Sequence, residues 1–189
     1  MTILRTPSDD DVTGLAAELY AEDRAALGYV PSHTRVTALH PEAVRAFEDL
    51  VRAVAHALGT RRYELVTLAA ARALGSRACL LAHGRKALSC MTAEELLAVA
   101  RDHRDAGLDE AEVAMMDFAA RLSTDSAAMT EADAQRLRDV GLSDREILDV
   151  ALAAGARNLY SRTLHALAVE VDDPPGLDPE LRDALLAGT

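Results

Sequence analysis

Residues 60–90 read TRRYELVTLAAARALGSRACLLAHGRKALSC, and this segment decides how the fold of the chain is interpreted. Alanine, leucine and arginine dominate it, and these residues are strong helix formers. Gly75 divides the segment, and glycine commonly ends helices because it accepts the left-handed conformation that follows the last turn. The segment therefore predicts a helix over about residues 61–74 and a second helix that contains Cys79 and His83.

The same helical pattern extends in both directions along the 189 residues. Half of the residues are hydrophobic, but aromatic residues make up only 3% and tryptophan is missing, so strand-forming side chains are scarce. Apolar residues recur at helical spacing and no segment alternates as a strand does. Besides the two helices above and a short helical turn after Pro31, we expect helices over about 10–27, 41–58, 93–104, 110–123, 131–139, 144–168 and 179–186. The sequence predicts an all-α bundle of about eight or nine helices.

Several helix starts carry capping signals. Thr92 with Glu95, and Ser143 with Glu146, fit the capping box, in which a hydroxyl and a carboxyl satisfy free amides at a helix start. The length is typical of one domain that buries a sizeable core. We therefore expect a single domain over residues 1–189, with its core motif at 60–90 and a C-terminal tail at 170–189, where three prolines interrupt the helical pattern.

The charge and the apolar patterning exclude several classes of partner. The formal net charge is −11, and no basic run is interleaved with aromatic residues, so the surface would repel a phosphate backbone and we expect no nucleic-acid partner. The first residues lack a signal-peptide stretch, and the apolar runs are shorter than a membrane span requires. A cytoplasmic protein without a membrane partner is expected, and its two cysteines are then free thiols rather than a structural bridge.

Residues 60–90 contain a group of reactive side chains. Ser76, Cys79 and His83 are spaced by three and four residues, so they share one face of a helix. Cys79 falls in or near the first turn, where free amides and the helix dipole favour an anion. His83 could then take or pass on a proton, and Glu64 on the preceding helix could orient the imidazole. The alternative is that Cys79 and His83 face the core and Glu64 is a solvated surface charge.

Other residues give weaker signals. Cys90 follows Cys79 by eleven residues, about 16 Å along a helix, which exceeds the limit of about 7 Å for a disulfide, so we expect a structural role for it. The six histidines show no helical ligand spacing, and there is no phosphate-binding loop, so we expect neither a metal nor a bound cofactor. Asn158, Tyr160 and His165 could line a pocket or could be ordinary core and surface residues.

The segment from Tyr63 to His83 resembles the signature of the alkylhydroperoxidase D-like, or carboxymuconolactone decarboxylase-type, family. That signature consists of a glutamate, eleven residues, a Cys-x-x-Cys pair, three residues and a histidine, and it falls here on Glu64, Ser76, Cys79 and His83. Residues 28–31, the helix that begins at Pro41 and residues 141–149 resemble the peroxidase-related branch of the family. The resemblance covers most of residues 10–172, and it departs from the pattern at one position, where Ser76 replaces the first cysteine.

The resemblance implies a function as well as a helical fold. It implies a thiol-dependent peroxidase of antioxidant type that reduces a small-molecule hydroperoxide, with Cys79 as the reactive thiol and His83 and Glu64 as its proton relay. It also implies self-association, and we expect a homo-oligomer built from dimers. Because Ser76 cannot resolve a sulfenic acid on Cys79, an external thiol reductant would be required.

Two other functions stay open from the sequence. The chain could be a decarboxylase or another lyase that acts on a small acid or lactone, with Glu64 and His83 as acid and base and Cys79 in a structural role. It could also be a redox-inactive helical oligomer that binds a small ligand.

Overall fold

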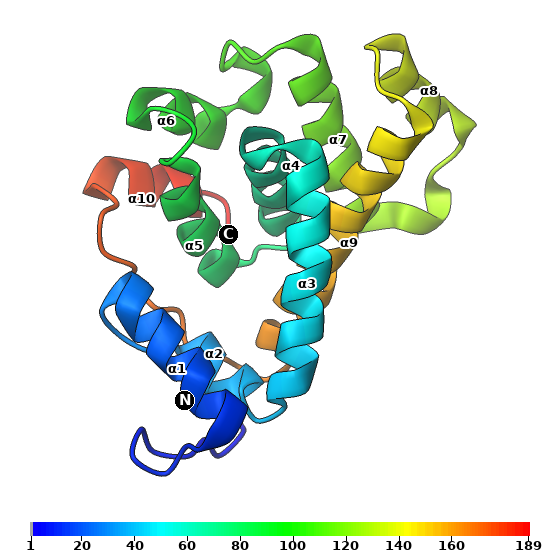
Figure 1. The fold of residues 1–189 in the computed structure, drawn as a ribbon. Helices are drawn as coiled ribbons and strands as arrows, with labels where there is room; N and C mark the ends of the chain where they lie inside the picture. The colour runs from blue at the N-terminus through cyan, green and yellow to red at the C-terminus, as the bar shows by residue number, and fades with distance from the viewer. Residues whose placement is uncertain (1) are drawn as a thin grey trace.

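The computed structural model describes residues 2–189, and these residues form ten α-helices, two 3-10 helices and no strand (Figure 1). The all-α prediction is confirmed. The helices are α1 (Gly14–Leu27), α2 (Ser32–Thr37), α3 (Pro41–Leu58), α4 (Thr60–Ala73), α5 (Arg77–Ala87), α6 (Ala93–Arg101), α7 (Glu110–Asp125), α8 (Glu131–Asp139), α9 (Asp144–Ala166) and α10 (Pro179–Leu186), with short 3-10 helices η1 (His103–Asp105) and η2 (Ser126–Ala128). In residues 2–189 no helix is long and apolar enough to cross a membrane.

Helix α4 lies at the centre of the fold. Every residue from Tyr63 to Ala71 is buried, as expected of a helix that is covered on all sides. It packs against α3, α5, α7 and α9, and Figure 1 shows α3, α5 and α7 arranged around it. The main hydrophobic core is built on this helix, which explains why residues 60–90 decide the fold.

The link between α4 and α5 sets the geometry of the site. Gly75 adopts a positive φ of 63°, which glycine accepts without a steric cost, and α5 begins directly after Ser76. The chain therefore reverses within a few residues, and α5 packs against α4. This reversal places His83 of α5 beside Glu64 of α4.

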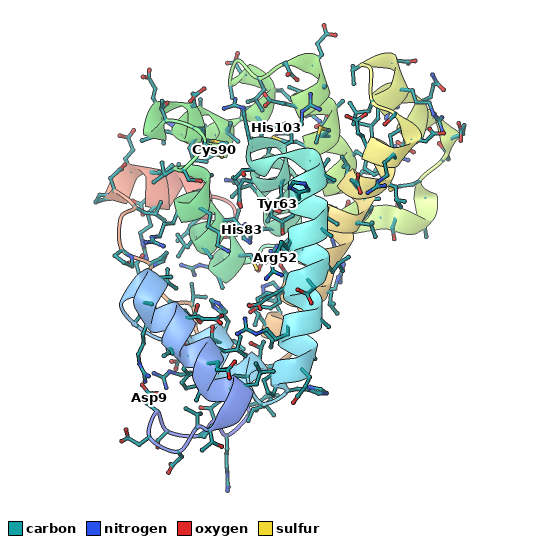
Figure 2. All side chains as sticks on the ribbon, viewed as in Figure 1. Asp9, Arg52, Tyr63, His83, Cys90 and His103 are labelled. Carbon is teal, nitrogen blue, oxygen red and sulfur yellow. The ribbon has the colours of Figure 1, made fainter. Side chains whose placement is uncertain are left out.

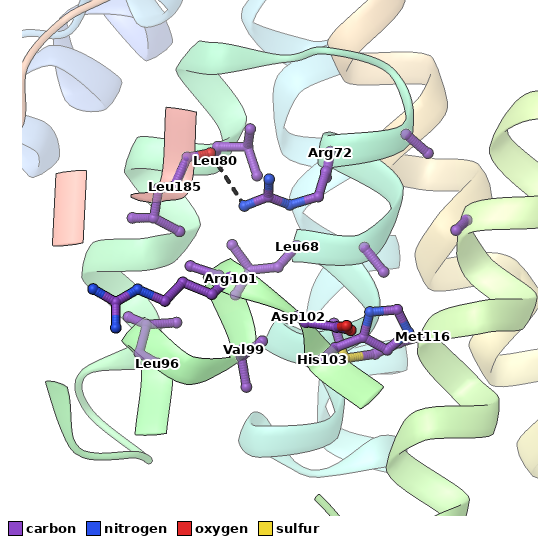
Figure 3. A pocket seen from close by; sticks show the side chains of 14 residues that line it. Leu68, Arg72, Leu80, Leu96, Val99, Arg101, Asp102, His103, Met116 and Leu185 are labelled. Carbon is purple, nitrogen blue, oxygen red and sulfur yellow. Dashed lines mark hydrogen bonds between the residues drawn. The ribbon is translucent and has the colours of Figure 1, made fainter. Parts of the chain in front are cut away.

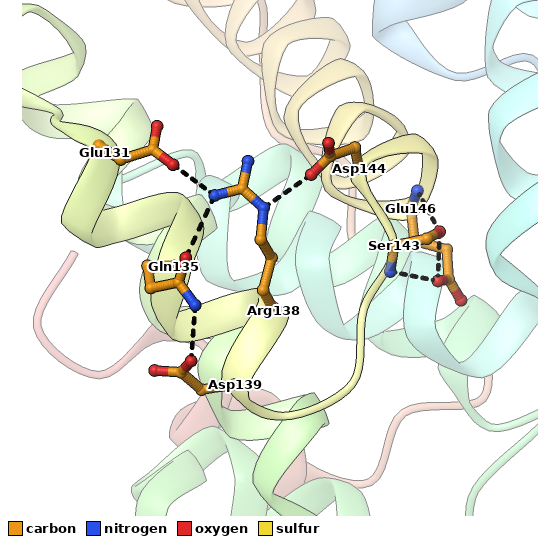
Figure 4. Close-up of polar contacts among 7 residues, drawn as sticks. All are labelled: Glu131, Gln135, Arg138, Asp139, Ser143, Asp144 and Glu146. Carbon is orange, nitrogen blue, oxygen red and sulfur yellow. Dashed lines mark hydrogen bonds and ion pairs between the residues drawn. The ribbon is translucent and has the colours of Figure 1, made fainter.

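The predicted capping boxes are present. The Ser143 hydroxyl accepts a hydrogen bond from the Glu146 amide, and the Glu146 carboxylate accepts one from the Ser143 amide at 2.8 Å (Figure 4). Thr92 and Glu95 form the same arrangement at the start of α6. In Figure 4 Arg138 also joins α8 to the start of α9, through ion pairs with Glu131 and Asp144.

The first helix starts later than the apolar pattern predicted, at Gly14 rather than near residue 10. The preceding aspartates are used in a turn, in which the Asp11 amide donates to the carbonyl of Ser8 at 3.1 Å. Asp9 is held away from a helix by ion pairs with Arg24 and Arg35. Side chains that bind elsewhere compete with helix formation, so the helix begins only after this turn.

Helices α1 and α2 form a small unit with a hydrophobic cluster of its own, separate from the main core. Figure 1 shows this unit, in blue, below α5 and beside the lower end of α3. Asp172 holds it to the C-terminal segment by accepting hydrogen bonds of 2.8 Å from the Ser32 amide and hydroxyl. Residues of α1 and α2 thus line one side of a cavity whose other side includes α5.

The C-terminal segment, expected as a tail on the surface, contributes to the main core. Helix α10 packs against α5 and α6, and Leu181 and Leu185 are each 1% exposed. A Cβ atom at position 84 would overlap with Cδ1 of Leu185, so Gly84 of α5 leaves room for the present position of that side chain.

Truncation of Leu185 tests this role. Leu185→Ala is expected to lower the free energy of unfolding by about 2–5 kcal/mol, because it leaves a cavity in the core. Urea denaturation measures the change, and Leu186→Ala, at a half-buried neighbour, is the matched control. Equal losses in the two variants would contradict a core role for α10.

Candidate functional site

The candidate site is a cavity of about 440 Å³ between the α1–α2–α3 side of the molecule and helices α5 and α9. Cys79 and His83 of α5 line it, together with Tyr63 of α4 and Arg157 of α9. Figure 2 shows Tyr63 and His83 between α3 and α5. The cavity therefore brings together side chains from segments that are far apart in the sequence.

Glu64 and His83 form a buried hydrogen-bonded pair. Nδ1 of His83 lies 2.7 Å from Oε2 of Glu64, and each side chain is 6% exposed. Burial raises the pKa of Glu64 to about 7, although Lys86 and Arg157 act in the opposite direction. Burial, aided by the positive charge of Arg157, lowers the pKa of His83 well below its ordinary value. The pair therefore favours a neutral carboxyl that donates to a neutral imidazole, and it holds a proton that can move near pH 7.

Cys79 lies in the first turn of α5, and the residue is 2% exposed. It accepts hydrogen bonds from Nη1 of Arg157 at 3.3 Å and from the hydroxyl of Ser161 at 3.2 Å, both from α9. Donors of this kind, one of them cationic, stabilise negative charge on sulfur. The sulfur at the floor of the cavity therefore has one cationic donor and one hydroxyl donor, both fixed on α9.

Arg157 is itself buried, at 5% exposure. Burial opposes its charge, but Cys79 and Tyr63 outweigh this cost and raise the pKa of the guanidinium. The guanidinium also lies 5.6 Å from the centre of the Tyr160 ring, which stacks on Phe47 at a centroid distance of 5.1 Å. A fixed cation and an aromatic wall therefore accompany the thiol.

Arg157 and Ser161 were not predicted from the sequence as site residues. One signal was present, because Arg157 interrupts the apolar run of residues 150–156, and an arginine inside such a run needs a buried partner. Of the three α9 residues considered from the sequence, Tyr160 lines the cavity. The Asn158 amide instead binds Ser123 and the Ala154 carbonyl, and His165 is exposed.

Ser76 and Cys90 lie outside the set of residues that line the cavity. Ser76 is fully buried at the start of α5, and its hydroxyl finds no hydrogen-bond partner in residues 2–189. Cys90 follows α5 in a turn, packs against the main core and donates from its sulfur to the Ala87 carbonyl at 3.3 Å. Of the two thiols, Cys79 is therefore the one that faces the cavity.

The described residues also show what the site lacks. In residues 2–189 no group of three histidine, cysteine or acidic side chains could hold a metal ion. A second pocket of about 220 Å³, between α4, α6, α7 and α10, is lined mainly by apolar side chains and contains no thiol (Figure 3). Of its two arginines, Arg72 donates to carbonyl groups at the end of α10, and Arg101 forms an ion pair with Glu180 at 2.6 Å.

Comparison with known proteins relates this arrangement to solved structures. No protein-family model matches the sequence, and no curated protein sequence matches it. One similar structure is an alkylhydroperoxidase AhpD core protein, an uncharacterised peroxidase-related protein from Ralstonia eutropha JMP134, at 22% identity and a TM-score of 0.78, over 98% of this chain and 97% of that chain.

Two further structures have a similar fold. A peroxidase-related protein from Silicibacter sp. TM1040 is 26% identical with a TM-score of 0.76, over 90% of this chain and 92% of that chain. A debrominase in complex with 2,3,4-tribromopyrrole is 17% identical with a TM-score of 0.75, over 98% of this chain and 96% of that chain. The chain therefore has the alkylhydroperoxidase D-like fold, as its resemblance to that family predicted.

Proposed function

We propose that the chain is a thiol-dependent peroxidase that reduces a small hydroperoxide through Cys79 alone. The observation that carries the proposal is the Cys79 sulfur, which receives two hydrogen bonds at the floor of a cavity shared with His83. A thiolate that is both stabilised and open to a cavity is the nucleophile that peroxide reduction requires.

In the proposed step the Cys79 thiolate attacks the terminal oxygen of the hydroperoxide. The S–O bond forms as the O–O bond breaks, so Cys79 becomes a sulfenic acid and the remainder of the hydroperoxide leaves as an alkoxide. His83 protonates the alkoxide from its free nitrogen and takes a proton from Glu64 through Nδ1. Glu64 does not line the cavity, so it acts through His83 and not on the substrate.

A trapping experiment tests the proposal. We expect peroxide to give a sulfenic acid on Cys79 that a dimedone-type reagent captures, and we expect Cys79→Ser to abolish both the adduct and the consumption of hydroperoxide in the presence of thiol. Cys90→Ser is the matched control and should behave as the wild type. Peroxide turnover by Cys79→Ser at the wild-type rate would refute the proposal.

The buried acid predicts a pH dependence. Because the pKa of Glu64 is raised to about 7, the shared proton is present below pH 7 and is lost as the pH rises through that value. The rate of Cys79 oxidation by an alkyl hydroperoxide, measured by stopped flow, should therefore show a component that falls near pH 7. Glu64→Gln keeps a hydrogen bond to His83 without a transferable proton, so the same profile should lose this component. An unchanged profile would show that Glu64 supplies no proton.

A second candidate function is removal of bromine from an aromatic ring. The stacked rings of Phe47 and Tyr160 beside a single cavity cysteine favour it, together with the similarity in fold to a debrominase. Bromide release from a brominated pyrrole in the presence of thiol distinguishes it from peroxide reduction. A lyase that uses Glu64 directly is disfavoured, because His83 separates this carboxyl from the cavity.

We further infer that the protein acts in the cytoplasm as a homo-oligomer built from dimers. Leu148, Leu152 and Leu159 of α9 are 54%, 38% and 60% exposed, and their spacing places them on one face of the helix. An exposed apolar stripe of this kind suits contact with a second copy. Light scattering should give more than one chain per particle, and Leu152→Glu should reduce that mass.

A further inference from the structure

A sulfenic acid on Cys79 would have to be reduced by a sulfur that enters the cavity from solvent. The structure offers no resolving thiol there, since Cys90 faces the core and Ser76 carries a hydroxyl. Cys79 is 2% exposed, and residues of α1 and α2 line the same cavity. Exchange requires the attacking sulfur to reach the Cys79 sulfur directly. A cysteine fixed on the surface of another folded protein is poorly shaped for this, whereas a small thiol can diffuse in.

The charged side chains that line the cavity indicate which charged groups the reducing thiol should carry. Arg45 is neutralised by Glu22 at 2.6 Å and by Glu48 at 2.9 Å. Arg52 forms an ion pair with Asp49 at 2.7 Å, and Arg157 is used by Cys79. Each of these three cations therefore already has a partner within the protein.

Two further charged side chains of the cavity, of opposite sign, have no ion-pair partner among residues 2–189. Asp23 of α1 accepts one hydrogen bond, from the Thr34 hydroxyl at 2.5 Å, and forms no ion pair within residues 2–189. Lys86 of α5 forms no ion pair within 4.0 Å in the same part of the chain. Asp23 raises the pKa of His33, which lines the same cavity, and Lys86 lowers it. One anion and one cation are thus available to a ligand that carries both signs.

We propose that the reductant is a low-molecular-weight aminothiol carboxylate, whose ammonium group binds Asp23 and whose carboxylate binds Lys86 while its sulfur reaches Cys79. The inference rests on the proposed function. The first thiol attacks the sulfenic acid, forms a mixed disulfide with Cys79 and releases water. A second thiol attacks this disulfide, which regenerates the Cys79 thiol and releases the oxidised dimer of the reductant.

The selection of the thiol can be tested without peroxide, by exchange of Cys79 with a symmetrical disulfide. The Cys90→Ser variant is mixed with one of four disulfides. Cystine carries both charged groups, cystamine lacks the carboxylate, dithiodipropionate lacks the ammonium group, and hydroxyethyl disulfide lacks both. Intact mass follows the mixed disulfide on Cys79. We expect cystine to react fastest, allowing for the intrinsic rate of each disulfide with a small thiolate.

Two variants test which group of the ligand Lys86 and Asp23 each bind. Lys86→Met should lower the rates for cystine and dithiodipropionate about tenfold relative to those for cystamine and hydroxyethyl disulfide, and Asp23→Asn should do the same for the two disulfides that carry an ammonium group. Arg77→Met and Glu18→Gln, at exposed charges of α5 and α1 outside the cavity, are the matched controls. Equal effects on all four disulfides, or none, would overturn the charge assignment.

The size of the reductant is tested on the peroxide-oxidised protein. Cysteine should reduce the Cys79 sulfenic acid faster than a thioredoxin-type protein dithiol at the same thiol concentration, and faster reduction by the protein would overturn the inference. If no sulfenic acid forms at all, the proposed function fails, while the exchange experiment still decides whether the cavity selects an aminothiol carboxylate.

Discussion

Arg157→Met is expected to lower the rate at which Cys79 reacts with hydroperoxide at pH 7 about a hundredfold or more, because the variant removes a fixed cationic donor from the reacting sulfur. In the structure this donor is Nη1 of Arg157, 3.3 Å from the Cys79 sulfur. Methionine is similar in length and fills much of the same buried volume, so the loss should reflect charge and hydrogen bonding more than packing.

The reactivity of the thiol itself separates two explanations for such a loss. Alkylation of Cys79 by iodoacetamide depends on the thiolate and not on a leaving alkoxide, so it should also slow in Arg157→Met if the guanidinium stabilises the sulfur anion. Arg162→Met is the matched control, because Arg162 is an exposed arginine on the same helix that binds the Ser123 carbonyl. Normal alkylation combined with slow peroxide reduction would instead place Arg157 on the substrate.

The stability of the variant needs a separate measurement. Replacing a buried charge by an apolar side chain can be neutral or stabilising, provided that its partner can become neutral, and a thiol can. We therefore expect the free energy of unfolding of Arg157→Met to stay within about 2 kcal/mol of the wild type. A folded variant with a slow thiol is the result that supports an electrostatic role.

The extent to which the site could be predicted depends on sequence separation. Glu64, Cys79 and His83 lie within twenty residues on two helices joined at Gly75, so helical spacing and one turn are enough to relate them. Arg157 and Ser161 follow Cys79 by 78 and 82 residues, and their contact with it depends on the packing of α9 against α4. Local periodicity carries no information on that packing.

In the fold, too, features that depend on nearby residues could be predicted, and features that depend on distant contacts could not. Capping residues and glycines located most helix ends, because these signals act over a few residues. The start of α1 was misplaced, since Asp9 is held by Arg24 and Arg35. The buried contacts of α10 could not be predicted either, because Leu185 depends on the missing side chain of Gly84.

Ser76→Cys is expected to convert the oxidised product of Cys79 from a trappable sulfenic acid into an internal disulfide. Residues three apart at a helix start have side chains about 5–6 Å apart, and a small adjustment of the first turn brings two sulfurs into bonding distance. Ser76 precedes the first turn of α5, and its hydroxyl has no partner within residues 2–189 that the substitution would break. A second thiol at this position could attack the sulfenic acid and expel water.

The change has a clear signature in mass. After peroxide, Ser76→Cys should lose two hydrogens and form at least tenfold less dimedone-type adduct than the wild type, an estimate that takes ring closure to outpace trapping by a dissolved reagent. Ser76→Ala, which removes the hydroxyl without adding a thiol, should keep the wild-type adduct. Undiminished trapping in Ser76→Cys would mean that position 76 faces away from the Cys79 sulfur, and that the serine reflects packing at the start of α5 rather than the loss of a resolving thiol.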